Sequence, residues 1–193
     1  MLATITLTTN SFGQLDKTTW LVGGTGSFYN YNGTYTSTSN NADTKVTNID
    51  IKTSIGYFLI DKLSVGLRSS FSYSKGKVYQ SGVQSGLISS TTLFLIVPFA
   101  RYYFLNKEKQ FSLLADVGYL FRTNSIPIGN KGKGSISEFS ISTGIEAFFN
   151  RSVSFEFLVG YKKKYEDIKG ATGYMDKKDG FQVGIGFQLH LIK

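Results

Sequence analysis

The chain has no cysteine, two prolines, one tryptophan and one histidine among its 193 residues. The absence of cysteine excludes disulfides, thiol catalysis and cysteine-ligated metal sites. Long hydrophobic runs are also missing, since no stretch approaches the roughly 18 apolar residues of a membrane-spanning helix. Helical membrane proteins and thiol-based enzymes are therefore excluded.

Glycine and aromatic residues are abundant, with 21 Gly, 12 Tyr and 16 Phe. This composition is typical of a β-rich chain, and the length suits one domain. The formal net charge of +8 favours anionic partners such as nucleic acid, acidic lipid or lipopolysaccharide phosphates. The basic residues are not interleaved with exposed aromatic residues on one surface, which argues against nucleic acid.

Apolar and polar residues alternate strictly in the closing segment "GFQVGIGFQLHLI", residues 180–192. Such alternation predicts an extended strand with one apolar and one polar face. The pattern recurs and predicts eight strands in all. They are Thr18–Tyr31, Val46–Ile60, Leu63–Ser74, Ser90–Leu105, Phe111–Thr123, Ile136–Phe149, Ser152–Tyr165 and Gly180–Ile192.

The connections between these strands alternate in length. Short turns are expected at residues 61–62, 106–110 and 150–151, and long polar loops at 32–45, 75–89, 124–135 and 166–179. Short turns on one rim and long loops on the other are typical of outer-membrane barrels. We therefore predict an all-β protein, a monomeric eight-stranded antiparallel up-and-down transmembrane β-barrel. Both termini would lie on the short-turn rim, which faces the periplasm in this class.

The polar faces are rich in glycine and serine and carry paired charges. An eight-stranded barrel has a lumen just wide enough for side chains to fill it, and a buried unpaired charge is costly. We therefore predict that the apolar faces meet lipid and that the polar faces form a plugged lumen with a balanced charge network. The predicted members are Asp50, Lys52, Arg68, Arg101, Asp116, Arg122, Glu138, Glu146, Glu156 and Lys162.

Three segments carry a family resemblance: "IGYFLIDKLSVGL" (Ile55–Leu67), "PFARYYF" (Pro98–Phe104) and the closing strand. With them, residues 18–193 resemble the small eight-stranded outer-membrane barrels of the OmpA/OmpX type, in the form common in Bacteroidota. The resemblance implies a location in the cell outer membrane and is almost silent about activity. One departure is the chain end at Ile192 and Lys193, where this family usually ends in an aromatic residue.

The first residues resemble the back half of a secretory signal. Residues 1–7 are mildly apolar, and Ser11 and Gly13 are small residues at the −3 and −1 positions of a cut before Gln14. We expect a signal peptide over residues 1–13 and a barrel domain over 14–193. The basic n-region is missing, so a truncated signal and an ordinary N-terminal segment remain alternatives.

Candidates for catalysis are few. His190 points into the lumen by its parity and lacks a neighbouring nucleophile, so we expect a hydrogen-bonded core residue, although a serine from another strand stays open. Glu138, Glu146 and Glu156 could form an acid–base pair or a calcium site, but the interleaved arginines favour ion pairs. The glycine-rich "GNKGKG" (Gly129–Gly134) lacks the ending of a phosphate loop. No catalytic, metal or cofactor site is predicted.

Basic residues gather near the long-loop rim. We expect either contacts with lipopolysaccharide phosphates or simple loop solubility from Lys75, Lys77, Lys131, Lys133, Lys163 and Lys164. The leading functional hypothesis is a non-enzymatic role. It comprises envelope structure, interaction through long extracellular loops, or service as an accessory barrel with other outer-membrane proteins. The alternatives are a lipid-A-modifying enzyme and a small-solute channel.

Overall fold

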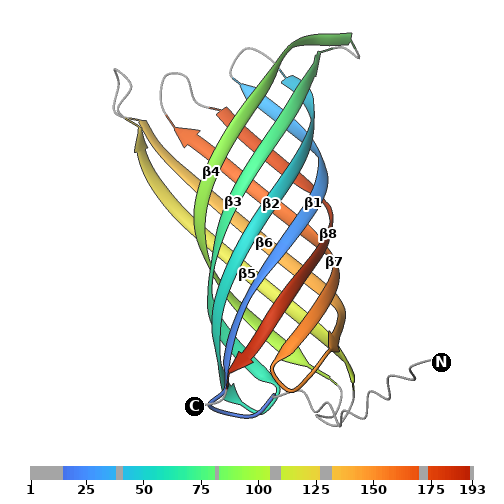
Figure 1. Ribbon diagram of the computed structural model, residues 1–193. Coiled ribbons are helices and arrows are strands. Elements are labelled where there is room, and N and C mark those ends of the chain that lie inside the picture. The colour runs from blue at the N-terminus through green and yellow to red at the C-terminus, as the bar shows by residue number, and fades with distance from the viewer. Residues whose placement is uncertain are drawn as a thin grey trace, which may run out of the picture.

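The computed structural model describes residues 15–37, 41–80, 83–104, 110–126, 132–169 and 174–191. Eight antiparallel strands form one closed barrel in chain order (Figure 1), which confirms the predicted fold class. Among the described residues there is no helix that is long and apolar enough to cross a membrane. The strands are β1 (Trp20–Ser37), β2 (Asn41–Ile60), β3 (Leu63–Gln80), β4 (Val83–Tyr103), β5 (Phe111–Ile126), β6 (Gly132–Phe148), β7 (Val153–Lys169) and β8 (Tyr174–Leu191).

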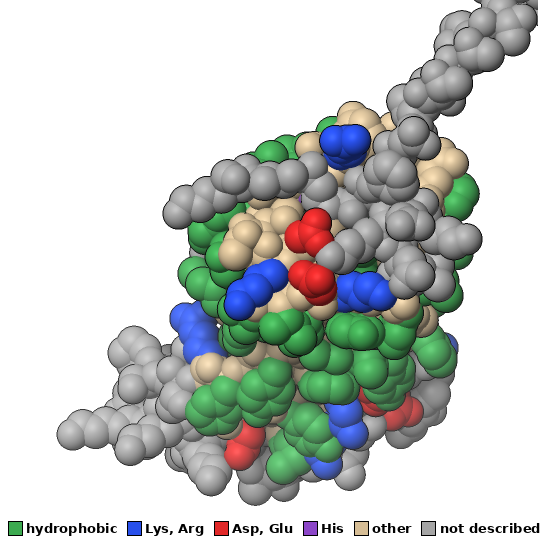
Figure 2. Space-filling model, turned by 90° about the horizontal axis from the view of Figure 1, so that it is seen from below, with side chains coloured by type: hydrophobic (Ala, Val, Ile, Leu, Met, Phe, Trp, Pro, Cys, Tyr) green, Lys and Arg blue, Asp and Glu red, His purple; other side chains and the backbone are tan. Residues whose placement is uncertain are grey.

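The outer wall of the barrel is apolar. Successive side chains of a strand point to opposite faces, and on β8 the exposed residues include Phe181, Ile185 and Leu189, while His190 and Gln188 are buried. Figure 2, seen from the end with the short turns, shows hydrophobic side chains along the wall and charged side chains gathered on the end face. An apolar belt of this extent suits contact with lipid, because monomeric soluble proteins rarely expose such patches.

The two ends of the barrel differ. At one end, the turn end, β1 begins, β8 ends, and short connections join β2 to β3, β4 to β5 and β6 to β7 (Figure 1). At the opposite end, the hairpin end, the prediction of long loops is wrong. The segments predicted as loops 32–45, 75–89, 124–135 and 166–179 are largely strand. Their threonines and tyrosines favour β structure, and hairpin pairing satisfies the backbone hydrogen bonds.

One pair of neighbouring strands is joined along only part of its length. Among the described residues, β4 and β5 share five residue pairs, from Phe99–Gly118 to Tyr103–Leu114. The other neighbouring pairs, including β1 with β8, stay in register along most of their length. The pairing between β4 and β5 stops at Phe99, and the next residue on β4 toward the hairpin end is Pro98. Proline cannot donate a backbone hydrogen bond. We call this partly joined boundary the β4–β5 seam.

The turn end is closed by the segment that precedes β1. Thr18 adopts a positive φ of 76°, which reverses the chain and sends Leu15 into the barrel. The Lys62 backbone N–H donates to the Leu15 carbonyl at 2.8 Å, and the Lys17 N–H donates to Asp61 Oδ1 at 2.8 Å. The buried side chain of Leu15 joins an apolar layer that consists of Leu15, Leu21, Phe58, Phe99, Tyr103, Leu114 and Phe148.

The orientation of the wall predicts how charges are tolerated on β8. Ile185 lies near the middle of the apolar belt and Phe181 lies closer to the hairpin end, both facing outward. We expect Ile185→Arg to lower the free energy of unfolding by about 2–4 kcal/mol and Phe181→Arg by about 0–1 kcal/mol, because the cost depends on depth in the bilayer. Urea titration of the protein refolded in lipid vesicles measures both. Equal costs for the two variants would contradict a lipid-facing wall.

Candidate functional site

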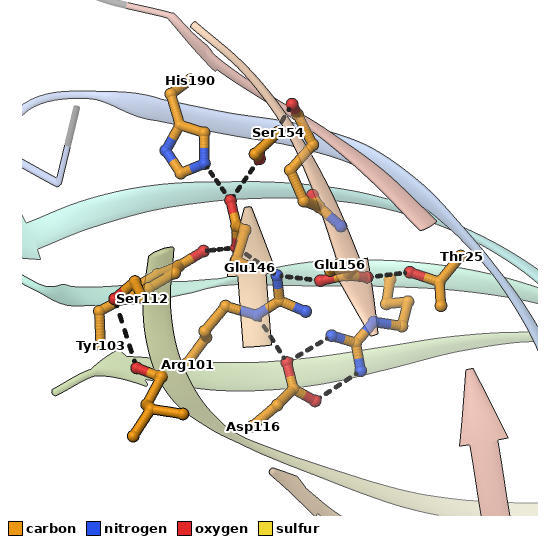
Figure 3. Close-up of polar contacts among 12 residues, drawn as sticks. Thr25, Arg101, Tyr103, Ser112, Asp116, Glu146, Ser154, Glu156 and His190 are labelled. Atoms are coloured by element: carbon orange, nitrogen blue, oxygen red, sulfur yellow. Dashed lines mark hydrogen bonds and ion pairs between the residues drawn. The ribbon is translucent and has the colours of Figure 1, made fainter. Parts of the chain in front are cut away.

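The lumen is filled by three groups of polar side chains stacked along the barrel axis. The central cluster joins β1, β3, β4, β5 and β7 (Figure 3). Arg101 is 2% exposed, and its guanidinium contacts Asp116 Oδ2 at 3.1 Å and Glu156 Oε2 at 2.7 Å. Arg68 binds both oxygens of Asp116, at 3.0 and 2.7 Å. The Thr25 hydroxyl donates to Glu156 Oε1 at 2.5 Å. This bidentate, charge-assisted arrangement is the strong form of ion pairing.

The turn-end cluster is centred on Glu146 of β6 (Figure 3). His190 Nε2 lies 2.6 Å from Glu146 Oε1, and the Ser154 hydroxyl donates to the same oxygen. The Tyr103 hydroxyl donates to the other oxygen at 2.8 Å. These four side chains are fully buried. The prediction that His190 is a hydrogen-bonded core residue is confirmed.

The hairpin-end cluster is held by Lys162 of β7. Its ammonium group lies 2.8 Å from Glu138 Oε1 and 3.5 Å from Asp50 Oδ2. The Tyr29 ring lies 4.5 Å from the same nitrogen, and the Tyr29 hydroxyl donates to Asp50 Oδ1 at 3.1 Å. Lys52 completes the cluster at 3.9 Å from Asp50. Two acidic groups, Asp50 and Glu138, and two basic groups, Lys52 and Lys162, therefore balance one another in this cluster.

Nine of the ten residues predicted for the charge network lie inside the barrel in these three clusters, and Arg122 does not. Its side chain is exposed, although Arg122 follows the inward parity of Leu120 on β5. The reason is the β4–β5 seam. Arg122 lies beyond the last residue that β5 pairs with β4, so the wall is not closed beside it and the side chain reaches solvent. The prediction of a lumenal Arg122 is corrected accordingly.

The charge count of the lumen is different once the exposed Arg122 is left out of it. The described part of the lumen then holds five carboxylates, on Asp50, Asp116, Glu138, Glu146 and Glu156, against Lys52, Arg68, Arg101 and Lys162. His190 lies at hydrogen-bond distance from Glu146. Glu146 therefore has His190 as a hydrogen-bonding partner besides Tyr103 and Ser154.

The lumen offers little scope for chemistry. Ser154, Glu146 and His190 resemble the components of a nucleophilic triad, but Ser154 donates to Glu146, and all three side chains are 0% exposed. A nucleophile must be activated by a base and reached by substrate, and burial prevents the second condition. Within the described ranges, no group of three or more histidine, aspartate or glutamate side chains is arranged to hold a metal ion.

The lysines expected near lipopolysaccharide are only partly described. Lys75 and Lys163 are exposed on β3 and β7, and Lys164 is half-buried beside Glu166 at 3.6 Å. Lys131 lies outside the described residues, as do the side chains of Lys77 and Lys133.

Comparison with solved structures places the fold. The outer membrane protein OprG from Pseudomonas aeruginosa is similar over 96% of this chain and 100% of its own, with a TM-score of 0.69 and 12% sequence identity. The chain has the fold of a small outer-membrane barrel. Neisserial surface protein A is matched over 86% of this chain and 96% of its own, at 15% identity and a TM-score of 0.38. No protein-family model and no curated protein sequence matches the chain.

Sequence reasoning missed several members of the clusters. Tyr29 and Thr25 lie on β1, where the alternation is weak, and Tyr103 belongs to a segment with apolar residues on both faces. The strand parity of Ser154 was available, but its contact with Glu146 depends on the neighbouring strand register. Leu15 carried no signal, because it precedes the first strand.

The central cluster predicts a large difference between two arginines. We expect Arg101→Met to lower the free energy of unfolding by about 3–5 kcal/mol, because Asp116 and Glu156 lose a buried partner. The matched control Arg122→Met removes an exposed arginine and should change it by no more than about 0.5 kcal/mol. Denaturant titration in detergent micelles measures both variants. A costly Arg122→Met would show that Arg122 belongs to the network after all.

Proposed function

We propose that the protein is a non-enzymatic outer-membrane barrel that does not conduct solutes and acts through its surfaces. One observation carries the proposal: the lumen is blocked at successive levels. The central cluster fills the middle of the lumen with paired charges, and the apolar layer around Leu15 covers the turn end. A solute would have to break buried ion pairs and then cross an apolar layer, and both steps are unfavourable.

The location in the outer membrane rests on the apolar outer wall and on the barrel fold that this chain shares with OprG. We propose the orientation usual for such barrels, with the turn end and both termini in the periplasm and the hairpin end outside the cell. A cleaved signal over residues 1–13, which lie outside the described residues, belongs to the same proposal. So does a closer relationship to OmpA/OmpX-type barrels of Bacteroidota.

Lipopolysaccharide is the proposed lipid partner at the hairpin end. On the outer face of β7 and β8, the paired rings of Tyr161 and Phe181 lie 5.7 Å apart, as in an aromatic girdle. Just beyond them, Lys163 and Lys177 each place their ammonium group 5.3 Å from the Tyr165 ring. Two exposed cations at the level of the headgroups suit the phosphates of lipopolysaccharide.

Protein partners form the second part of the proposal. The β4–β5 seam leaves backbone groups of both strands without a strand partner in the described residues. Such groups are costly in a hydrocarbon environment, and pairing with another polypeptide would satisfy them. This feature supports service as an accessory barrel in a larger outer-membrane complex.

Two measurements test the non-enzymatic, non-conducting reading. In planar bilayers, the purified protein should show no discrete conductance steps, whereas a diffusion porin in the same bilayer serves as the positive control. Mass spectrometry of lipid A from cells with and without the protein should give the same acyl pattern. Conductance steps would overturn the closed lumen, and a changed acyl pattern would establish a lipid-A-modifying enzyme instead.

The lipopolysaccharide contact has its own test. We expect the double variant Lys163→Gln, Lys177→Gln to bind lipopolysaccharide vesicles roughly tenfold or more weakly, since each lysine near an anionic surface contributes about 1 kcal/mol. Flotation of the refolded protein with the vesicles at low salt gives the measurement. The control Lys17→Gln, Arg151→Gln removes two exposed charges at the turn end and should bind as the parent does. Equal losses in both double variants would contradict a local site.

A further inference from the structure

The β4–β5 seam leaves two sheet edges open at the level of the apolar belt. Beyond the last pair, Phe99–Gly118, the outward side chains include Ile96 of β4, which is 55% exposed, and Phe121 of β5, which is 64% exposed. Large apolar side chains on the outer wall face hydrocarbon. Open sheet edges do not persist in hydrocarbon, because their N–H and C=O groups cannot reach water there. The seam therefore needs a partner that supplies main-chain groups.

Both open edges belong to strands that continue toward the hairpin end. From the end of their shared pairing, β4 runs back from Pro98 to Val83, and β5 runs on from Tyr119 to Ile126. Over these ranges β4 is paired with β3, and β5 is paired with β6. The two strands diverge toward the hairpin end (Figure 1). Each strand therefore offers one edge, the edge that faces the seam, for pairing with another chain.

The directions of the two edges decide which kind of partner fits. Because β4 and β5 are antiparallel, a single strand inserted between them would be antiparallel to one and parallel to the other. A second copy of the chain, inserted in the membrane in the same orientation, presents a β5 antiparallel to β4 and a β4 antiparallel to β5. One two-fold axis along the membrane normal makes both pairings at once, and two-fold dimers are the commonest homo-oligomers.

The side chains at the seam fit such a joint. Continuing the β4–β5 register beyond Phe99–Gly118 sets Ile96 opposite Phe121, with both side chains on the lipid side. The alternation of faces is thereby kept, as sheet pairing requires. The inner side of the seam is also apolar, because Leu95, Val97 and Leu120 form a buried cluster there. The joint between two copies would therefore continue the apolar belt without placing a charge in hydrocarbon.

We propose that two copies of the chain pair through their seams, β4 of each copy with β5 of the other, about a two-fold axis along the membrane normal. The inference rests on the proposed outer-membrane location. It makes a second copy of the chain the partner at the seam, in place of the monomer expected from the sequence. The joint lies in the hairpin-end half of the barrel. The central cluster and the apolar layer at the turn end stay within each chain, so the lumen of each copy remains blocked.

Disulfide mapping tests the joint, because the chain has no cysteine of its own. The variants Ile96→Cys and Phe121→Cys, one of them carrying a size tag, are refolded together in lipid vesicles and oxidised. Residues opposite each other in antiparallel strands have Cα atoms close enough for a disulfide. We expect a covalent dimer of tagged and untagged chains in several-fold excess over the control mixture of Ile51→Cys and Ile185→Cys. Both control side chains are exposed on the outer wall, on β2 and β8. Equal yields from the two mixtures would overturn the proposal.

Two further measurements cover the case in which a cysteine variant does not fold. Native mass spectrometry of the parent protein in lipid nanodiscs should give twice the mass of one chain, and a single-chain mass would overturn the dimer. In a chain that carries both Ile96→Cys and Phe121→Cys, a disulfide within one chain would show that the seam closes on itself, which also overturns it. A single-chain mass together with a disulfide from Ile96→Cys to another outer-membrane protein would overturn the dimer and leave the accessory role standing.

Discussion

The structure depends on charge pairing inside a narrow barrel. Arg101 is the centre of this pairing, because one guanidinium neutralises carboxylates from β5 and β7 across the lumen. In a water-filled channel the same contacts would contribute little. In a packed lumen each charge depends on its partners, so the clusters hold opposite walls of the barrel at fixed distance. Glycines make the room for them. A Cβ on Gly186, for example, would lie 2.4 Å from the Gly24 carbonyl oxygen and 3.0 Å from Glu156 Oε1.

Much of the fold could be predicted from the alternation of residue types. The period of two fixes which side chains share a face, and the chemistry of each face decides which one meets lipid. Where a segment is apolar on both faces, this reasoning fails. In β4 the residues Leu95, Val97 and Phe99 lie inside and Ile96 lies outside, a choice that only packing against Leu120 decides. The hairpin extensions were also beyond prediction, because polar residues in paired strands look like loop residues.

The candidate site was less predictable than the fold. Parity identified most lumenal charges because it needs only the strand and the face. It could not identify partners, since these depend on the stagger between strands that are far apart in the chain. Parity also failed for Arg122, which lies beyond the part of β5 that pairs with β4. His190 was expected as a hydrogen-bonded core residue, and its partner Glu146 emerged only from the three-dimensional arrangement.

The β4–β5 seam has a mechanical consequence. β1 and β8 are paired along most of their length. The barrel is therefore equivalent to one curved sheet with the strand order β5, β6, β7, β8, β1, β2, β3, β4, whose edge strands β5 and β4 are joined only at the turn end. Its weakest join is internal to the polypeptide, far from either end. Local unfolding of a single barrel should therefore separate β4 from β5 first. Amide protons of β4 and β5 beside the seam should exchange with solvent before those of β1 and β8. The first and last strands, β1 and β8, are by contrast paired with each other and with β2 and β7 along most of their length.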